Sequence, residues 1–251
     1  MSTPTVPGTS YVLVAMTTPS YDVPRGVPLL VAVVALILAG CGSDQSAAGH
    51  RRDLPPAAVP PSAARARAQL DRLVVTARPR GTEGYVRAAF GDSWVDTDHD
   101  GCNQRDDVLL RDAVRGTTQV QQQGACDHDV LAGTWHDPYT GRILVFTDLK
   151  DLHQAEAIQI DHVVPLAEAW VSGARSWSKE RRELFANDLG ELLAVDGPTN
   201  AGKGDDDPAA WRPRKGYQCT YARRWITIKT RYHLAVDTSE KAALDQMLGY
   251  C

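Results

Sequence analysis

From residue 67 onward, the chain combines two patterns of apolar spacing. Five segments have the pattern of helices: 67–77, 104–115, 178–187, 219–232 and 238–248. Three short apolar runs are typical of buried strands: 142–147, 158–164 and 191–195. Helices with a few short strands among them predict an α+β fold in a mostly helical single domain.

The N-terminal region has a different pattern. Residues 27–39, VPLLVAVVALILA, are an uncharged apolar run. The run is shorter than the roughly 20 residues of a transmembrane helix and fits the apolar region of a secretory signal peptide. Its end and the next two residues read LAGC, which resembles the bacterial lipobox. We therefore expect residues 1–40 to be a signal peptide and Cys41 to be lipidated. An uncleaved anchor or a plain secretory signal is the alternative.

Residues 41–66 are rich in Pro, Ala, Gly and Ser and have no apolar periodicity. Such a composition predicts a disordered tether, and residues 67–251 are then the folded domain. We expect an exported protein that reaches a membrane only through the N-terminal lipid, or a secreted one. The sequence indicates no protein partner.

Composition narrows the class of protein. The 251 residues are 43% hydrophobic and 23% charged, with a net charge of −4. These values exclude a polytopic membrane protein and a wholly disordered chain. The negative total argues against a uniformly basic nucleic-acid binder, although a local basic patch is compatible with it.

Five cysteines are an odd number, so one of them has a different role from the others. With Cys41 lipidated, four can form disulfides, as expected in an oxidising compartment. Four cysteines allow three pairings, and we favour the pairing in which both disulfide bonds close short loops. A zinc site is the rival interpretation, but the sequence has no C-x-x-C pair. The favoured pairs are Cys102–Cys126 and Cys219–Cys251.

The first candidate catalytic residues lie near the end of the predicted strand 158–164, where Asp161 and His162 are adjacent. Neighbouring strand residues point to opposite faces, so the two can share a target only if the strand ends or bends there, as Pro165 suggests. An Asp carboxylate suits a hard cation such as Mg²⁺, and a neutral His suits a general base. A surface Asp beside a partly buried His is the simpler alternative.

A second group follows in residues 191–204, ELLAVDGPTNAGKG. A short strand enters a Gly-Pro turn, and Asn200 opens a helical turn. Lys203 lies three residues later, on the same helical face. Asn200 is a good helix N-cap, which is its structural reading, but its amide oxygen is also a hard metal ligand.

Together these motifs resemble the HNH endonucleases of the His-Me finger (ββα-metal) class, and most of all the group related to the C-terminal domain of GmrSD-type restriction endonucleases. The resemblance rests on IDHVVPLAEAW (160–170), WSKERRELFANDL (177–189) and LLAVDGPTNAGKGDDDPAAWRP (192–213), with GTWHDPYTGR (133–142) upstream. It implies a ββα-metal core and a metal-dependent endonuclease.

The resemblance also implies roles for individual residues. His162 would be the general base, and Asp161 and Asn200 would bind one divalent ion, Mg²⁺ or Mn²⁺. Lys203 would orient the loop or neutralise phosphate. Glu191 stands near the position of the family's middle asparagine, which orients the histidine. Glu191 would take over that role, or Asn187 would do so after a small shift.

Residues 212–231 contain seven basic residues and no Asp or Glu, which suits a phosphate-bearing substrate. Tyr217, Tyr221 and Trp225 lie among them and would either stack on bases or pack in the core. The segment has no residue pattern that indicates contacts to base edges, so we expect low sequence specificity. The nucleic-acid-binding candidates are Arg212, Arg214, Lys215, Arg223 and Arg224.

Residues 96–101 read DTDHDG, the opening of a calcium loop. Asp96, Asp98 and Asp100 are candidate Ca²⁺ ligands, and Asp107 falls at the twelfth position, where an EF-hand has a bidentate Glu. An acidic turn closed by a disulfide is the alternative.

The sequence therefore predicts an exported, metal-dependent HNH endonuclease that hydrolyses the phosphodiester bonds of DNA or RNA. The alternative is a non-catalytic, calcium-stabilised envelope lipoprotein on a decayed nuclease fold.

Overall fold

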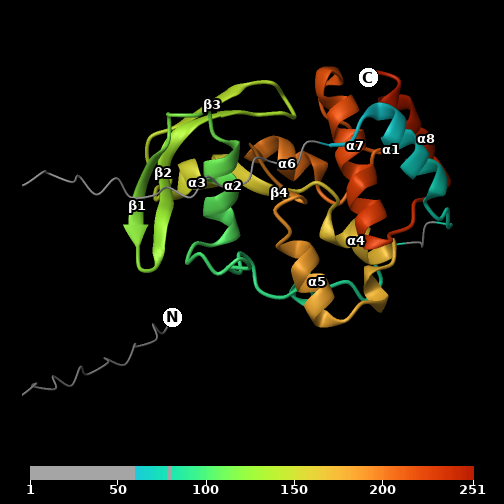
Figure 1. Ribbon diagram of the computed structural model, residues 1–251, viewed down its shortest axis with the longest axis horizontal. Helices are drawn as coiled ribbons and strands as arrows, with labels where there is room; N and C mark the ends of the chain where they lie inside the picture. Colours follow the sequence, from blue (N-terminus) through green and yellow to red (C-terminus); the bar gives the residue numbers. More distant parts are fainter. Residues whose placement is uncertain (1–59, 78–80) are drawn as a thin grey trace, which may run out of the picture. The chain divides into compact units, whose positions relative to one another are not determined.

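The computed structural model describes residues 60–77 and 81–251 (Figure 1). The expected signal peptide, Cys41 and most of the expected tether lie outside the described residues. The α-helices are α1 (Ala63–Arg72), α2 (Gln104–Asp112), α3 (Leu152–Ala157), α4 (Leu166–Val171), α5 (Lys179–Ala186), α6 (Gly197–Lys203), α7 (Lys215–Tyr232) and α8 (Thr238–Leu248). Two 3₁₀ helices are η1 (Arg87–Phe90) and η2 (Ala174–Ser176). The strands are β1 (Gln119–Gln123), β2 (Cys126–His136), β3 (Ile143–Phe146), β4 (Ile158–His162) and β5 (Leu192–Asp196).

The strands form two small antiparallel sheets. One sheet has the order β1-β2-β3, and β4 pairs with β5 in the other. In that second sheet Asp161 pairs with Leu193 and His162 pairs with Leu192. Helix α6 follows β5 directly and packs against both β4 and β5. The α+β class is therefore confirmed, and the order strand, strand, helix is the one that a ββα core requires.

Side chains at the helix ends explain why several helices begin where they do. Asp196 ends β5 and caps α6, because its side chain accepts a hydrogen bond from the backbone of Thr199. Asp237 and Glu240 form a capping box at the start of α8. Ser62 caps α1, which begins four residues before the expected domain boundary at Arg67. The predicted boundary between tether and domain is therefore wrong, because residues 63–66, the last of the predicted tether, are helical.

The β4–β5 pair separates two hydrophobic clusters, because alternate residues of each strand face opposite sides. Leu193 and Val195 pack into the cluster formed with α1, α4, α5, α7 and α8. Leu192 and Ala194 pack into the cluster formed with α2, β2 and β3. Every residue of β5 is buried, so both faces of the strand that pairs with β4 are covered by protein.

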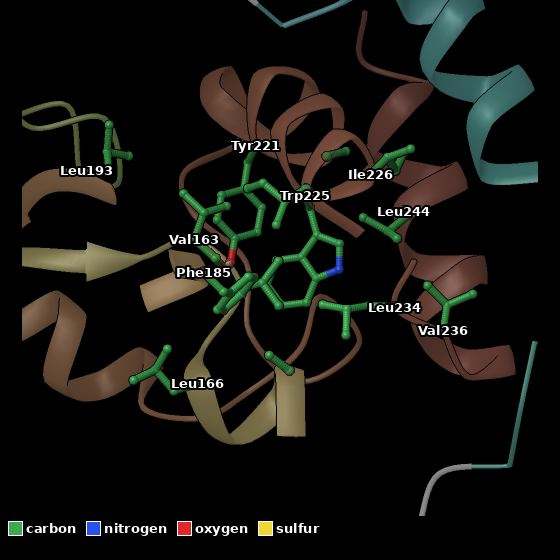
Figure 2. Packing of buried hydrophobic residues seen from close by; sticks show 14 of the residues in the cluster. Val163, Leu166, Phe185, Leu193, Tyr221, Trp225, Ile226, Leu234, Val236 and Leu244 are labelled. Carbon is green, nitrogen blue, oxygen red and sulfur yellow. Dashed lines mark hydrogen bonds between the residues drawn. The ribbon is translucent and has the colours of Figure 1, made fainter. Parts of the chain in front are cut away.

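Trp225 of α7 is fully buried in the larger cluster, and Figure 2 shows it between Tyr221 and Phe185 on one side and Leu234 and Leu244 on the other. Its indole N–H donates to Glu240 at 2.6 Å. The hydroxyl of Tyr221 donates to the carbonyl of Val163 at 3.3 Å. These two aromatic residues therefore belong to the core rather than to a base-stacking surface.

Both favoured disulfides are present and confirm the predicted pairing. Cys102 is joined to Cys126, and Cys219 is joined to Cys251. The second bond ties the end of the chain, just after α8, to α7. Among residues 60–77 and 81–251, no helix is both long and apolar enough to span a membrane.

Candidate active site

His162 is the last residue of β4, and its imidazole is fixed by the backbone at the end of α5. Its Nε2 lies 2.9 Å from the carbonyl oxygen of Ala186. A carbonyl oxygen can only accept a hydrogen bond, so Nε2 carries the proton. The lone pair of the ring is then on Nδ1, which is the atom that can accept a proton.

The surroundings of His162 keep its ring neutral. The side chain is buried, and this burial lowers the pKa of His162 from 6.5 to about 3. The positive charge of Arg87 acts in the same direction, whereas the hydrogen bond to Ala186 opposes it. The imidazole is therefore neutral at neutral pH, and with so low a pKa it is a weak base until a neighbouring anion raises that pKa.

His162 lines a small pocket together with residues of η1 and of the segment that follows it. The pocket volume is about 20 Å³, which is room for one water molecule. Arg87, an exposed cation, lies on the pocket wall. The rest of the lining is Phe90, Gly91, Asp92, Ser93, Trp94, Leu166, Ala186 and Asn187. A base, a water-sized space and a cation are thus brought together.

Asp161 points to the other face of β4, because the strand keeps its regular register through His162. β4 ends before Pro165, as expected, but it keeps its regular register through His162, so the two side chains do not converge. One oxygen of Asp161 accepts from Nζ of Lys203 at 2.8 Å. The other accepts from the hydroxyl of Tyr139 at 2.5 Å. Lys203 also donates to the carbonyl of His162 at 2.8 Å, so it fixes the end of the strand.

Protein groups occupy the ligand oxygens of one of the two expected metal ligands, Asp161. Asp161 is 5% exposed and both of its oxygens are hydrogen-bonded. Asn200 faces Gln159 instead, and its Nδ2 donates to Gln159 Oε1 at 2.9 Å. Because both Asp161 oxygens are bonded, Asp161 as it stands does not offer the free oxygen that Mg²⁺ or Mn²⁺ needs, whereas the hydrogen bond of Asn200 uses its nitrogen and not its amide oxygen. The ammonium group of Lys203 takes the place beside Asp161 that the resemblance gives to the ion.

Glu191 does not contact the imidazole of His162. Its Oε1 accepts from the backbone N–H of Val164 at 2.8 Å. Burial raises the pKa of Glu191 well above its ordinary value, which favours the protonated, neutral form of the side chain. The expected orienting role for Glu191 is therefore wrong in this geometry, because the Ala186 carbonyl fills it. Asn187 lines the pocket beside His162. Its side-chain oxygen accepts from the backbone N–H of Val95, and its Nδ2 donates to the carbonyl of Glu183.

The basic segment does not form a continuous cationic face. Lys229 is fully buried, where its ammonium lies 2.8 Å from carboxylate oxygens of both Glu168 and Glu240. Several of the nucleic-acid-binding candidates have partners within the protein. Arg212 donates to Pro208 and Gln246, Arg214 donates to Pro138, Lys215 lies over the ring of Tyr250, and Arg223 donates to the carbonyls of Pro60 and Pro61.

Arg224 is the exception among these candidates. It is 8% exposed, and within the described part of the chain its Nη1 has no hydrogen-bond partner. It lines a cavity of about 250 Å³ beside two further arginines, Arg65 and Arg231. This cavity has no carboxylate in its lining, although Arg231 pairs with Asp188 at 2.7 Å.

Sequence reasoning missed three contributors to the site. The carbonyl of Ala186 is a backbone group, so no residue type could reveal it. Arg87 lies in a stretch without clear periodicity. Tyr139 lies in the upstream stretch GTWHDPYTGR, where its neighbour Asp137 organises the turn by accepting from the backbone of Tyr139 and Asp196. That stretch was the one available signal for Tyr139.

The fold and the site define an α+β domain with a buried histidine at the end of the first strand of a β-β-α unit. Residues 104–247 match the family model of the GmrSD restriction endonucleases, C-terminal domain. The match covers more than half of the chain, and the chain belongs to this family. It is also 42% identical over 205 residues to an "Uncharacterized secreted protein" of Arthroderma benhamiae, an alignment that covers 78% of this chain and 92% of that protein. No solved structure matches the chain.

Proposed function

We propose that this protein is an exported endonuclease that hydrolyses phosphodiester bonds of DNA or RNA with low sequence specificity, and that His162 is its general base. The observation that carries the proposal is the fixed tautomer of His162, which directs proton acceptance to Nδ1 beside a water-sized pocket. Membership of a nuclease family supports the same activity.

In the proposed reaction, a water molecule in the pocket attacks the phosphorus of a phosphodiester. Nδ1 of His162 takes a proton from that water as its oxygen bonds to phosphorus. The bond from phosphorus to the leaving sugar oxygen breaks, and that oxygen takes a proton from solvent. Arg87 would hold a non-bridging phosphate oxygen. The bound phosphate also raises the pKa of His162, because an anion favours the protonated ring.

The proposal includes no step at a metal ion. Binding of Mg²⁺ or Mn²⁺ at Asp161 would require its carboxylate to exchange Lys203 or Tyr139 for the ion. The resemblance still predicts an ion requirement, so cleavage should be measured both with EDTA and with each added ion. Cleavage that persists in EDTA would show that the reaction needs no divalent ion.

Export of this chain is part of the proposal. The relative from Arthroderma benhamiae is described as a secreted protein. The apolar run of residues 27–39 of this chain fits a signal peptide. Lipidation at Cys41 remains a prediction, which metabolic labelling with a radioactive fatty acid tests in a Cys41→Ser pair.

The rival function is a non-catalytic lipoprotein on a decayed nuclease fold, and one observation favours it: the Asp161 carboxylate is bonded to Lys203 rather than free. Plasmid nicking by the purified protein separates the two functions. The endonuclease proposal predicts conversion of supercoiled DNA to the open circle in at least one of the EDTA, Mg²⁺ and Mn²⁺ reactions. No conversion above the protein-free control in any of them overturns it.

A further inference from the structure

The loop before α2 and the first turn of that helix carry four carboxylates, and they follow directly in sequence the segment that lines the His162 pocket. The ligand oxygens of Asp96, Asp98 and Asp100 lie within 4.8 Å of one another. Asp107, in the first turn of α2, has a carboxylate oxygen within the same distance of a ligand oxygen of Asp100. The like charges of Asp96, Asp98 and Asp100 repel one another at this spacing unless a cation lies among them, whereas Asp107 also contacts His128 through one of its oxygens.

The spacing of these residues follows a calcium loop beyond its acidic opening. With Asp96 as position one, Asp98 and Asp100 are positions three and five, Gly101 is position six and Asp107 is position twelve. Gly101 has a φ of +96°, and a Cβ there would lie 2.6 Å from the carbonyl oxygen of Ala125. The turn therefore requires glycine at the position where an EF-hand has its invariant glycine.

Three buried oxygens in this loop provide a second, independent observation. In the described part of the chain, Asp96 Oδ1, Gln104 Oε1 and Asp107 Oδ2 have no hydrogen-bond partner. Gln104 and Asp107 are both 0% exposed. Buried oxygens without a partner are costly and rare. They fall at positions one, nine and twelve, all of which supply calcium ligands in an EF-hand loop.

Neighbouring contacts hold these oxygens in place. Nε2 of Gln104 donates to Thr97 at 2.7 Å, so its amide lies against the loop and Oε1 remains without a partner. His128 lies 2.8 Å from Asp107 Oδ1, which leaves Oδ2 for another ligand. The Cys102–Cys126 disulfide joins position seven of the loop to the start of β2.

We propose that residues 96–107 form a Ca²⁺ site whose side-chain ligands are Asp96, Asp98, Asp100, Asp107 and Gln104, the last directly or through water. Ca²⁺ is favoured over Mg²⁺ because it accepts many oxygens in a flexible geometry. Asp at position twelve is shorter than Glu, so the affinity falls in the weak range of extracellular modules, about 10⁻⁴–10⁻³ M. Bound Ca²⁺ would also fix Trp94, which lies two residues before the loop in the pocket wall.

Calcium titration of the EDTA-treated, disulfide-intact protein tests the site without reference to nuclease activity. Isothermal titration is expected to show one Ca²⁺ site, and Mg²⁺ is expected to bind at least tenfold more weakly. Addition of 10 mM Ca²⁺ should raise Tm by about 3–8 °C. Tb³⁺ in place of Ca²⁺ should show luminescence sensitised by Trp94.

Asp98→Asn is the test variant, because Asp98 is exposed and its change leaves the core intact. We expect it to weaken Ca²⁺ binding about tenfold or more. Asp71→Asn is the matched control, since Asp71 is an exposed acid on α1. The proposal is overturned by an absence of Ca²⁺ binding in the unaltered protein, by equal Mg²⁺ binding, or by equal effects of the two substitutions.

Discussion

The ammonium group of Lys203, on α6, lies 2.8 Å from the carboxylate of Asp161, on β4, and both side chains are buried. Lys203 also donates to the carbonyl of His162. A single helical lysine therefore neutralises the acidic residue of the Asp-His pair and holds the backbone of the base. This pair of contacts explains how the end of the strand keeps its position.

Replacement of Lys203 should destabilise the protein strongly. Lys203→Met leaves the Asp161 carboxylate buried without its charge partner, which costs about 3–5 kcal/mol. Chemical denaturation measures this change in the free energy of unfolding. The double variant Asp161→Asn/Lys203→Met should recover a large part of the loss, because no buried charge remains. Equal loss in the single and double variants would contradict the ion-pair account.

Glu191 should be replaceable by glutamine. Burial raises the pKa of Glu191 well above its usual value, so the glutamine of a Glu191→Gln variant would be close in shape and charge to the neutral acid that it replaces. The amide oxygen of the new side chain can still accept from the backbone N–H of Val164. We expect unfolding free energy within about 1 kcal/mol of the unaltered protein and an unchanged nicking rate. A more than tenfold slower rate at equal stability would restore the orienting role that the sequence suggested.

Arg87 should contribute to substrate cleavage, because it is the exposed cation on the wall of the His162 pocket. Arg87→Ala is expected to lower kcat/KM about 10–100-fold, with little change in Tm. Arg72→Ala is the matched control, since Arg72 is an exposed cation on α1 and does not line that pocket. Similar losses in both variants would indicate a general effect of surface charge.

The low pKa of His162 predicts a pH dependence of stability. The ring titrates near 6.5 in the unfolded chain and near 3 in the folded protein. Between these values the unfolded chain binds more protons, so the stability contributed by neutral His162 is lost as the pH falls from 6.5 toward 3. At pH 4 the loss is on the order of 3 kcal/mol.

Denaturation of the unaltered protein and of His162→Gln at pH 7 and pH 4 measures this loss. Glutamine does not titrate, and its amide can donate to Ala186 as the imidazole does. Because the other titrating groups are shared, the difference between the two proteins isolates His162. If both lose the same stability on acidification, the pKa of His162 is not lowered.

Much of the fold could be predicted from the sequence, because apolar spacing is a local property. Helices α2, α5, α7 and α8 and strands β3, β4 and β5 all lie within a few residues of their predicted bounds. Strand β1, QVQQQ, was missed because it is polar and mostly exposed. The burial pattern of its partner β2 departs from simple alternation, and the pairing of β1 with β2 contains register shifts.

The site was predictable only in part, because residue type does not determine which atoms meet. The Asp161–His162 pair was located correctly, but its regular strand register places the two side chains on opposite faces. Lys229 belongs to a basic run, yet it pairs with carboxylates from α4 and α8 that are distant in sequence. The disulfide pairing was predictable because both bonds close local loops.

The most direct test of the central claim is the nicking rate of supercoiled plasmid by the unaltered protein, His162→Ala and His162→Gln under the conditions that support cleavage. Loss of a general base predicts a rate lower by about 10²–10⁴ in both variants. Near-UV circular dichroism and Tm should show that both variants remain folded. Cleavage within threefold of the unaltered rate by either folded variant would contradict the assignment of His162 as the general base.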